Sequence, residues 1–311
     1  MAITAATKTS NLAGFIRPEI AQAYFAEVQK ASVVQSLARQ VPLSVSGEAI
    51  PVLTEKPTAS WVEEGAKKPT TQAGLTMKTM TPKKIAAIAV VSAEVVRANP
   101  GNYMEVLRQE IAESFARAFD DAVIHGTSNP FGVGTNLAST SKTVKLGTSP
   151  ANKGGIFADL NSGLDLLVKD KKKLNGFVFD DVAEPLFNAS VDANGRPLFV
   201  PEPTVATAAV RSGTVLGRPA SFADTVANGT ATGSVVGIGG DFSKALWGTV
   251  GGINFDVSTE STVTILNQLA SFCEHNAVAI PAEAEFRWLI ASNTPLVTYT
   301  PQPGLEARRL C

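Results

Sequence analysis

Between Asn102 and Gly126 hydrophobic residues recur at intervals that are mostly three or four, which predicts a long amphipathic helix. The positions that define its apolar face are Tyr103, Leu107, Ile111, Phe115 and Phe119. Pro100 favours a helix start and Gly126 a helix end. We therefore expect a rod over 101–124, about 35 Å long. An ordinary core helix is the alternative that periodicity alone leaves open.

The segment before this helix, residues 52–85, has no helical period and is rich in Thr, Gly and Pro. Leu75 to Met80 partly alternate, which predicts a strand with one apolar face. The segment holds too few apolar residues to bury itself, so it is either a hairpin lying on another surface or disordered. The residues we expect to contact a partner are Trp61, Glu63, Glu64, Lys67, Lys68, Met77 and Met80.

The remaining pattern predicts an α+β chain. Short helices are expected at 18–30, 32–38, 157–169 and 182–188. Strands are expected at 41–45, 49–53, 84–91, 176–180, 214–222, 234–242 and 284–290, with two more within 245–257. The prolines of the tail, residues 293–311, indicate an extended strap.

Composition limits the classes of function. With 311 residues and 44% hydrophobic content, the chain can form one large or two ordinary domains. A net charge of −1 argues against a basic face for tight nucleic-acid binding. Lys171–Lys173 is expected to be a solvated loop, with weak nucleic-acid contact as the alternative. No apolar window approaches the length of a membrane span, and the N-terminus lacks a signal-peptide core.

The sequence offers no recognisable catalytic or metal-binding constellation. Its histidines are His125 and His275, and no metal-binding spacing surrounds them. Cys273 and His275 lack an orienting third residue, and Cys311 ends the given sequence, which disfavours a structural disulfide. The glycine-rich runs lack the lysine of a phosphate loop. We expect no enzyme activity, no cofactor and no metal.

Several short motifs occur in a fixed order along the chain. They are Trp61-Val-Glu63-Glu64-Gly65, Lys83-Lys84-Ile-Ala, Val91-Ser92-Ala-Glu94, Asp120 with Gly126, Pro130-Phe-Gly132, Gly195-Arg-Pro197-Leu-Phe199, Leu216-Gly217-Arg-Pro219 and Gly240-Asp241-Phe242-Ser243. Each is weak alone, but together they resemble the major capsid proteins of tailed double-stranded-DNA bacteriophages. The resemblance runs from about Arg17 to Trp288.

This resemblance implies the phage capsid fold, which encapsulins and herpesvirus shell proteins share. In that fold an N-terminal arm and an extended loop reach neighbouring subunits, a spine helix crosses a peripheral domain, and an axial domain surrounds the capsomer axis. The expected boundaries are 1–51 for the arm and short helix, 52–85 for the extended loop, 86–150 with 257–298 for the peripheral domain, 101–124 for its spine, 151–256 for the axial domain and 299–311 for a C-terminal strap.

The function implied is structural. Subunits would assemble in the host bacterial cytoplasm as hexamers and pentamers of an icosahedral shell, and the virion would enclose double-stranded DNA without sequence-specific binding. Expected partners are other copies of the chain, a separate scaffolding protein or none, a portal and decoration proteins, with no membrane. Some relatives join subunits through a lysine–asparagine bond, for which Lys67, Lys68 and Lys78 are candidates without a matched partner. An encapsulin-type compartment holding cargo enzymes is the alternative.

Overall fold

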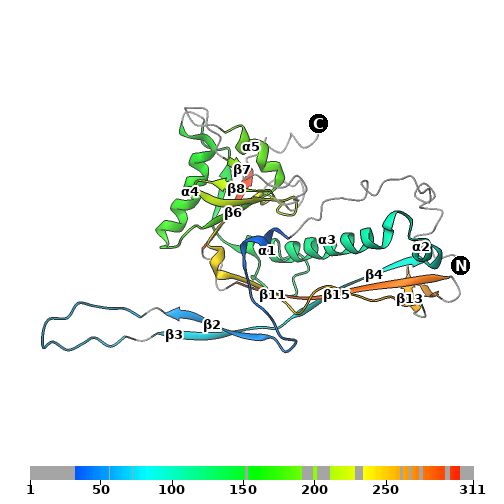
Figure 1. Cartoon of the computed structure of the whole chain (residues 1–311). Helices are drawn as coiled ribbons and strands as arrows, with labels where there is room; N and C mark the ends of the chain where they lie inside the picture. The colour runs from blue at the N-terminus through cyan, green and yellow to red at the C-terminus, as the bar shows by residue number, and fades with distance from the viewer. Residues whose placement is uncertain are drawn as a thin grey trace.

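The computed structural model describes most of the chain between residues 32 and 301. The described stretches are 32–55, 57–71, 73–150, 153–190, 199–201, 211–227, 234–259, 262–265, 268–272, 276–290 and 295–301. The predicted arm up to residue 31, Cys273, His275 and the tail from residue 302 lie outside them. Figure 1 shows a body built on the long helix α3, a second body above it, and a hairpin that projects to the left.

The first body is a five-stranded sheet covered by helix α3. Its strands are β1 (Arg39–Gln40), β4 (Lys83–Ser92), β11 (Ala245–Thr249), β12 (Asn254–Phe255) and β15 (Ala277–Ile290). The long strands β4 and β15 pair antiparallel from Ser92 opposite Ala277 to Lys83 opposite Phe286. Small residues on β15, Ala282 and Ala284, let the helix approach the sheet closely.

The spine helix α3 covers Tyr103–Ile124, two residues shorter at its start than expected. It follows helix α2 (Ala93–Ala98), whose N-cap Ser92 accepts a hydrogen bond from the Val95 amide at 3.4 Å. The chain then turns through a 3-10 segment, Pro100–Asn102, in which Gly101 has a φ of 59°. At about 1.5 Å per residue the 22-residue helix is about 33 Å long.

The second body is a seven-stranded mixed sheet packed against helix α4 (Gly155–Lys169). In spatial order its strands are β5 (Thr143–Leu146), β16 (Leu296–Pro301), β10 (Gly237–Gly240), β6 (Gly176–Phe179), β9 (Arg218–Phe222), β8 (Arg211–Val215) and β7 (Phe199–Pro201). Helix and sheet meet closely at Gly163, where a Cβ would lie 2.3 Å from the Tyr299 hydroxyl oxygen.

Smaller elements complete the described part of the chain. They are α1 (Val33–Leu37), α5 (Glu184–Asn188), the hairpin strands β13 (Thr262–Ile265) and β14 (Gln268–Ser271), and the 3-10 turns η4 (Leu137–Ser139), η6 (Asp181–Ala183) and η7 (Phe242–Lys244). Among the described residues no helix combines the length and apolar character that crossing a membrane requires.

Strand pairing corrects the expected boundaries between the two bodies. Strand β11, placed within 151–256, pairs with β15 in the first sheet. Strand β16 lies between β5 and β10 in the second sheet, so residues 299–301 belong to a paired strand, buried at Tyr299 and Thr300, and not to a strap. Strand β5 also belongs to the second sheet, although it was assigned to the first body.

Two local expectations are corrected as well. The strand expected at 214–222 is a hairpin, because Leu216 and Gly217 both have positive φ and reverse the chain between β8 and β9. Residues 41–45 form an irregular segment and not a strand. The neighbouring strand expected at 49–53 is present, and it extends over 48–55.

Candidate assembly surfaces

The projecting hairpin is built from β2 (Glu48–Glu55) and β3 (Gly74–Met80), shown at the lower left of Figure 1. Residues directly opposite each other in an antiparallel pair point to the same face. Pro51 lies opposite Met77, and both are exposed, as is Leu75 two residues along the strand. Leu75 and Met77 remain 66% and 60% exposed. One face of the hairpin is therefore apolar and not covered by the described part of the chain.

The other face anchors the hairpin to the first body. Met80 is fully buried against Leu246 and Leu289, from β11 and β15. Lys78 Nζ donates a hydrogen bond to the Ile290 carbonyl at 3.4 Å. Gly47, with a φ of 87°, lies so close that a Cβ would be 2.7 Å from the Met80 carbonyl oxygen. The root of the hairpin is thus fixed to the sheet.

The tip of the hairpin, residues 57–71, is exposed at every position. The Ala66 amide donates to the Glu63 carbonyl at 3.0 Å, and Gly65 has a φ of 80°, so the chain reverses in a tight turn. Trp61 has a relative exposure of 104%, as in an extended peptide. A large apolar side chain that the described residues leave fully exposed to water is unusual in a monomer and is typical of a binding surface.

The charged residues predicted at this tip flank the turn. Glu63 and Glu64 precede Gly65, and Lys67 and Lys68 follow it. All four are exposed, and none forms an ion pair with another described residue. The structure therefore brings Trp61 and these four charges together at one end of the arm.

Met80, one of the predicted contact residues, does not lie on the exposed surface of the arm. Its side chain lies in the core of its own subunit, so it has no surface to offer a neighbour. Alternation explains the difference, because Met77 and Met80 are three residues apart and point to opposite faces of the strand. Met77 remains on the open face.

The five positions predicted to form the apolar face of the spine helix face the first sheet. Ile111, Phe115 and Phe119 are buried, and Phe115 is only 2% exposed. Leu107 and Tyr103 are half-buried and pack against the buried clusters beside β4 and β15. The side chains of Phe119 and Phe286 meet with ring centroids 5.4 Å apart.

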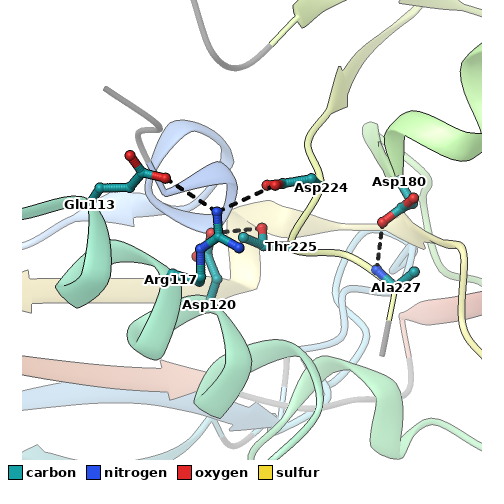
Figure 2. A network of polar contacts seen from close by, with 7 residues as sticks. All are labelled: Glu113, Arg117, Asp120, Asp180, Asp224, Thr225 and Ala227. Carbon is teal, nitrogen blue, oxygen red and sulfur yellow. Dashed lines mark hydrogen bonds and ion pairs between the residues drawn. The ribbon is translucent and has the colours of Figure 1, made fainter. Parts of the chain in front are cut away.

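A buried carboxylate on the spine helix joins three parts of the chain. Asp120 accepts hydrogen bonds from the Ser32 hydroxyl, from the Val33 amide at 2.9 Å and from the Thr225 hydroxyl at 3.3 Å. Ser32 and Val33 begin helix α1. Thr225, whose contact with Asp120 is drawn in Figure 2, follows β9 in the second body. Burial raises the pKa of Asp120 from 3.8 to about 6, and these donors oppose the rise.

Other polar groups lie at or beside the same junction. Arg117 bridges Glu113 at 3.2 Å and Asp224 at 3.4 Å, which links the spine to the segment after β9 (Figure 2). Buried Asp180 accepts a hydrogen bond from the Ala227 amide at 2.9 Å. His125, at the end of the spine, has its pKa lowered chiefly by burial. Of these contacts, the Arg117–Asp224 ion pair joins the second body to the spine, whereas the Asp180–Ala227 hydrogen bond lies within the second body.

Sequence reasoning did not identify this junction, although a signal was present. Asp120 lies four residues before Ile124, which is fully buried, so the two share a helix face. An acid on an apolar face indicates a buried polar contact. Its partners Ser32 and Thr225 are about 90 and 105 residues away in sequence, and no local pattern names them.

Within the described residues, no group of three or more His, Cys, Asp or Glu side chains converges as a metal site would require. The buried carboxylates Asp120, Asp159 and Asp180 are each engaged by backbone amides or hydroxyls. What this structure presents is a rigid body with an exposed arm, an arrangement suited to binding other protein surfaces.

Known proteins agree with this architecture. The sequence profile of the Phage capsid family matches residues 13–297. The chain is 41% identical over 315 residues to the "Probable major capsid protein gp17" of Mycobacterium phage L5, covering 97% of this chain and 94% of that protein. It is equally identical, over 279 residues, to the protein of that name from Mycobacterium phage D29, covering 88% and 86%.

Solved structures show the same fold. A chain from Mycobacterium phage Cain superposes with a TM-score of 0.72 at 21% identity, covering 95% of this chain and 98% of that one. A chain from Gordonia phage Cozz gives 0.70 at 23% identity, covering 94% of both. The α+β fold expected from the sequence motifs is confirmed: it is the fold of phage shell proteins.

The chain belongs to the phage capsid family. Its relatives are named as major capsid proteins, so its class is that of structural proteins and not of enzymes.

Proposed function

We propose that this chain is the major capsid subunit of a bacteriophage, assembling with copies of itself as hexamers and pentamers into an icosahedral shell around double-stranded DNA. One observation carries the proposal: a rigidly rooted arm exposes an apolar face and a tryptophan that the described residues do not cover. The names of the relatives from phages L5 and D29 support it. They also favour a phage shell over an encapsulin-type compartment.

In this proposal each part of the subunit has a role in the shell. The first body, with α3 as its spine, is the peripheral domain. The second body, with boundaries redrawn to include β5 and β16, is the axial domain. The hairpin is the extended loop, and Trp61, Glu63, Glu64, Lys67, Lys68 and Met77 contact a neighbouring subunit. Assembly takes place in the host bacterial cytoplasm, with a separate scaffolding protein, a portal and decoration proteins as further partners.

The first test is the size of the purified chain, measured by sedimentation and negative-stain imaging. Closed shells or capsomer rings are expected, because the described part of the chain leaves the arm exposed and another subunit can cover it. A chain that stays a 32.5 kDa monomer at high concentration and with a scaffolding protein would contradict the proposal.

A second test removes the exposed indole. Trp61→Ala is expected to raise the subunit concentration needed for assembly about tenfold or more, since interface tryptophans often contribute 2 kcal/mol or more. The free energy of unfolding of the unassembled subunit should change by less than about 0.5 kcal/mol. Val133→Ala is the matched control, because Val133 is also fully exposed but lies outside the arm. Equal effects of the two substitutions would show that the arm has no special role.

A further inference from the structure

The turn after helix α4 concentrates positive charge on a nearly neutral protein. Residues 142–173 contain seven lysines and three aspartates, whereas the whole chain has a net charge of −1. Residues 169–173 are all exposed, and four of these five are lysines. The ion pair between Lys142 and Asp170, at 2.7 Å, brings the start of β5 to the same place.

Among the described residues, the acids of this region pair with two of its seven lysines, and the uncompensated ones include three in a row. Asp165 pairs with Lys169 at 2.5 Å, and Asp170 pairs with Lys142. Asp159 is buried and accepts hydrogen bonds from the loop at 147–149. Lys171, Lys172 and Lys173 form no ion pair with any residue in the described part of the chain.

The backbone of the turn is ordered, and it holds a lysine where glycine is usual. The Lys171 amide donates to the Val168 carbonyl and the Lys172 amide to the Leu167 carbonyl, both at 2.9 Å. Lys171 has a φ of 57°, the left-handed conformation that glycine or asparagine normally takes after a helix. The chain thus presents a third adjacent ammonium group at a position that disfavours any side chain.

We propose that Lys171, Lys172 and Lys173 form a contact surface for the phosphate backbone of the DNA enclosed by the shell. The inference rests on the proposed function. Lysine is a flexible point charge that suits sequence-independent phosphate contacts. Residues 142–173 contain no arginine. Arginine is the residue that pairs in a fixed, bidentate geometry with carboxylates on a protein surface. These features favour DNA over an acidic face of a second copy.

Lysine labelling of intact particles tests this directly. DNA-filled particles and particles emptied of DNA are treated with an amine-acetylating reagent, and peptides carrying residues 171–173 are quantified by mass spectrometry. The expected result is protection in filled particles and reaction in emptied ones. Reaction in both would place the lysines away from DNA, and protection in both would show that another subunit covers them. Either result overturns the proposal while leaving the shell itself intact.

The salt dependence of binding gives an independent measurement. Unassembled subunits are titrated with a 30-base-pair duplex at several salt concentrations. The variant K171Q/K172Q/K173Q should flatten the slope of log affinity against log salt by about 2.7, the value for three lost phosphate contacts. K83Q/R97Q/K244Q removes the same charge from exposed sites elsewhere and should leave the slope nearly unchanged. Equal slopes for the two variants would contradict the assignment. Failure of the chain to form particles would instead contradict the proposed function.

Discussion

At the scale of single residues, Asp120 is where the spine helix, the start of α1 and the second body meet. Replacing it with alanine leaves two hydroxyls and one amide without their acceptor, but it also removes a carboxylate whose burial is costly. The opposing terms lead us to expect Asp120→Ala to lower the free energy of unfolding by about 2 kcal/mol at pH 7. Urea unfolding of the unassembled subunit measures this.

The matched control for that experiment is Asp165→Ala. Asp165 is on another helix, is half-exposed and forms only a surface ion pair with Lys169, so its loss should cost less than about 0.5 kcal/mol. If the two substitutions had equal effects, the hydrogen bonds to Asp120 would contribute nothing specific to the junction.

The raised pKa of Asp120 also gives a pH dependence with a definite sign. Its folded-state value of about 6 exceeds the unfolded value of 3.8, so the folded protein holds this proton more tightly. The stability that this carboxyl contributes is complete below pH 3.8 and is lost as the pH rises through about 6. The Asp120→Asn variant does not titrate at this position. Relative to it, the free energy of unfolding of the wild-type subunit should rise by about 1.3 kcal/mol when the pH is lowered from 7 to 5.

Urea titrations of both proteins at the two pH values provide that difference, and the effects of other titrating groups cancel in it. A flat difference, or one of opposite sign, would mean that the carboxyl is not held in the dry environment seen between α1, α3 and Thr225.

At the scale of elements, the hairpin separates folding from assembly on one strand. Met80→Ala removes a fully buried side chain and should destabilise the subunit by about 2–4 kcal/mol. Met77→Ala, on the open face, should leave the free energy of unfolding within about 0.5 kcal/mol but weaken assembly. Thermal unfolding and sedimentation, run on both variants, distinguish these effects. An assembly defect in neither, or a folding defect in both, would contradict the two-faced hairpin.

The spine and the arm could be predicted from the sequence because each is defined by a local pattern. The spacing of Leu107, Ile111 and Phe115 fixes a helix face, and the lack of apolar residues around Trp61 indicates an arm that cannot bury itself. The exact face of Met80 was missed because the partly alternating pattern of Leu75–Met80 does not say which side meets the body.

Sheet membership could not be predicted in the same way. Strands β11 and β16 are both short apolar runs, and their sequences do not distinguish the sheets that they join. The sheet that each strand joins is determined by pairing between residues far apart in sequence, such as Tyr299 opposite Gly237. There the glycine is required, since a Cβ at Gly237 would lie 2.2 Å from the Phe179 ring. Such complementarity is visible only once the strands are placed.

At the scale of the whole molecule, the tip of the arm is exposed at every position from 57 to 71, so we expect the fold of the subunit not to depend on it. Replacing residues 56–73 with Asn-Gly should preserve folding, because this pair closes two-residue hairpins and Glu55 already lies opposite Gly74. The free energy of unfolding should rise by no more than about 2 kcal/mol, the loop-closure difference between eighteen residues and two. Sedimentation should show folded subunits that no longer form shells.

A second variant separates the length of the arm from its chemistry. Filling residues 57–71 with glycine and serine keeps the reach of the arm but removes Trp61 and the four charges around Gly65. If these side chains bind a neighbour, this variant should also fail to assemble, whereas normal shells from it would reduce the tip to a spacer. Normal shells from the shortened chain would show that assembly does not require the tip at all. Because residues 57–71 are exposed throughout, a loss of assembly in either variant cannot be attributed to a damaged core.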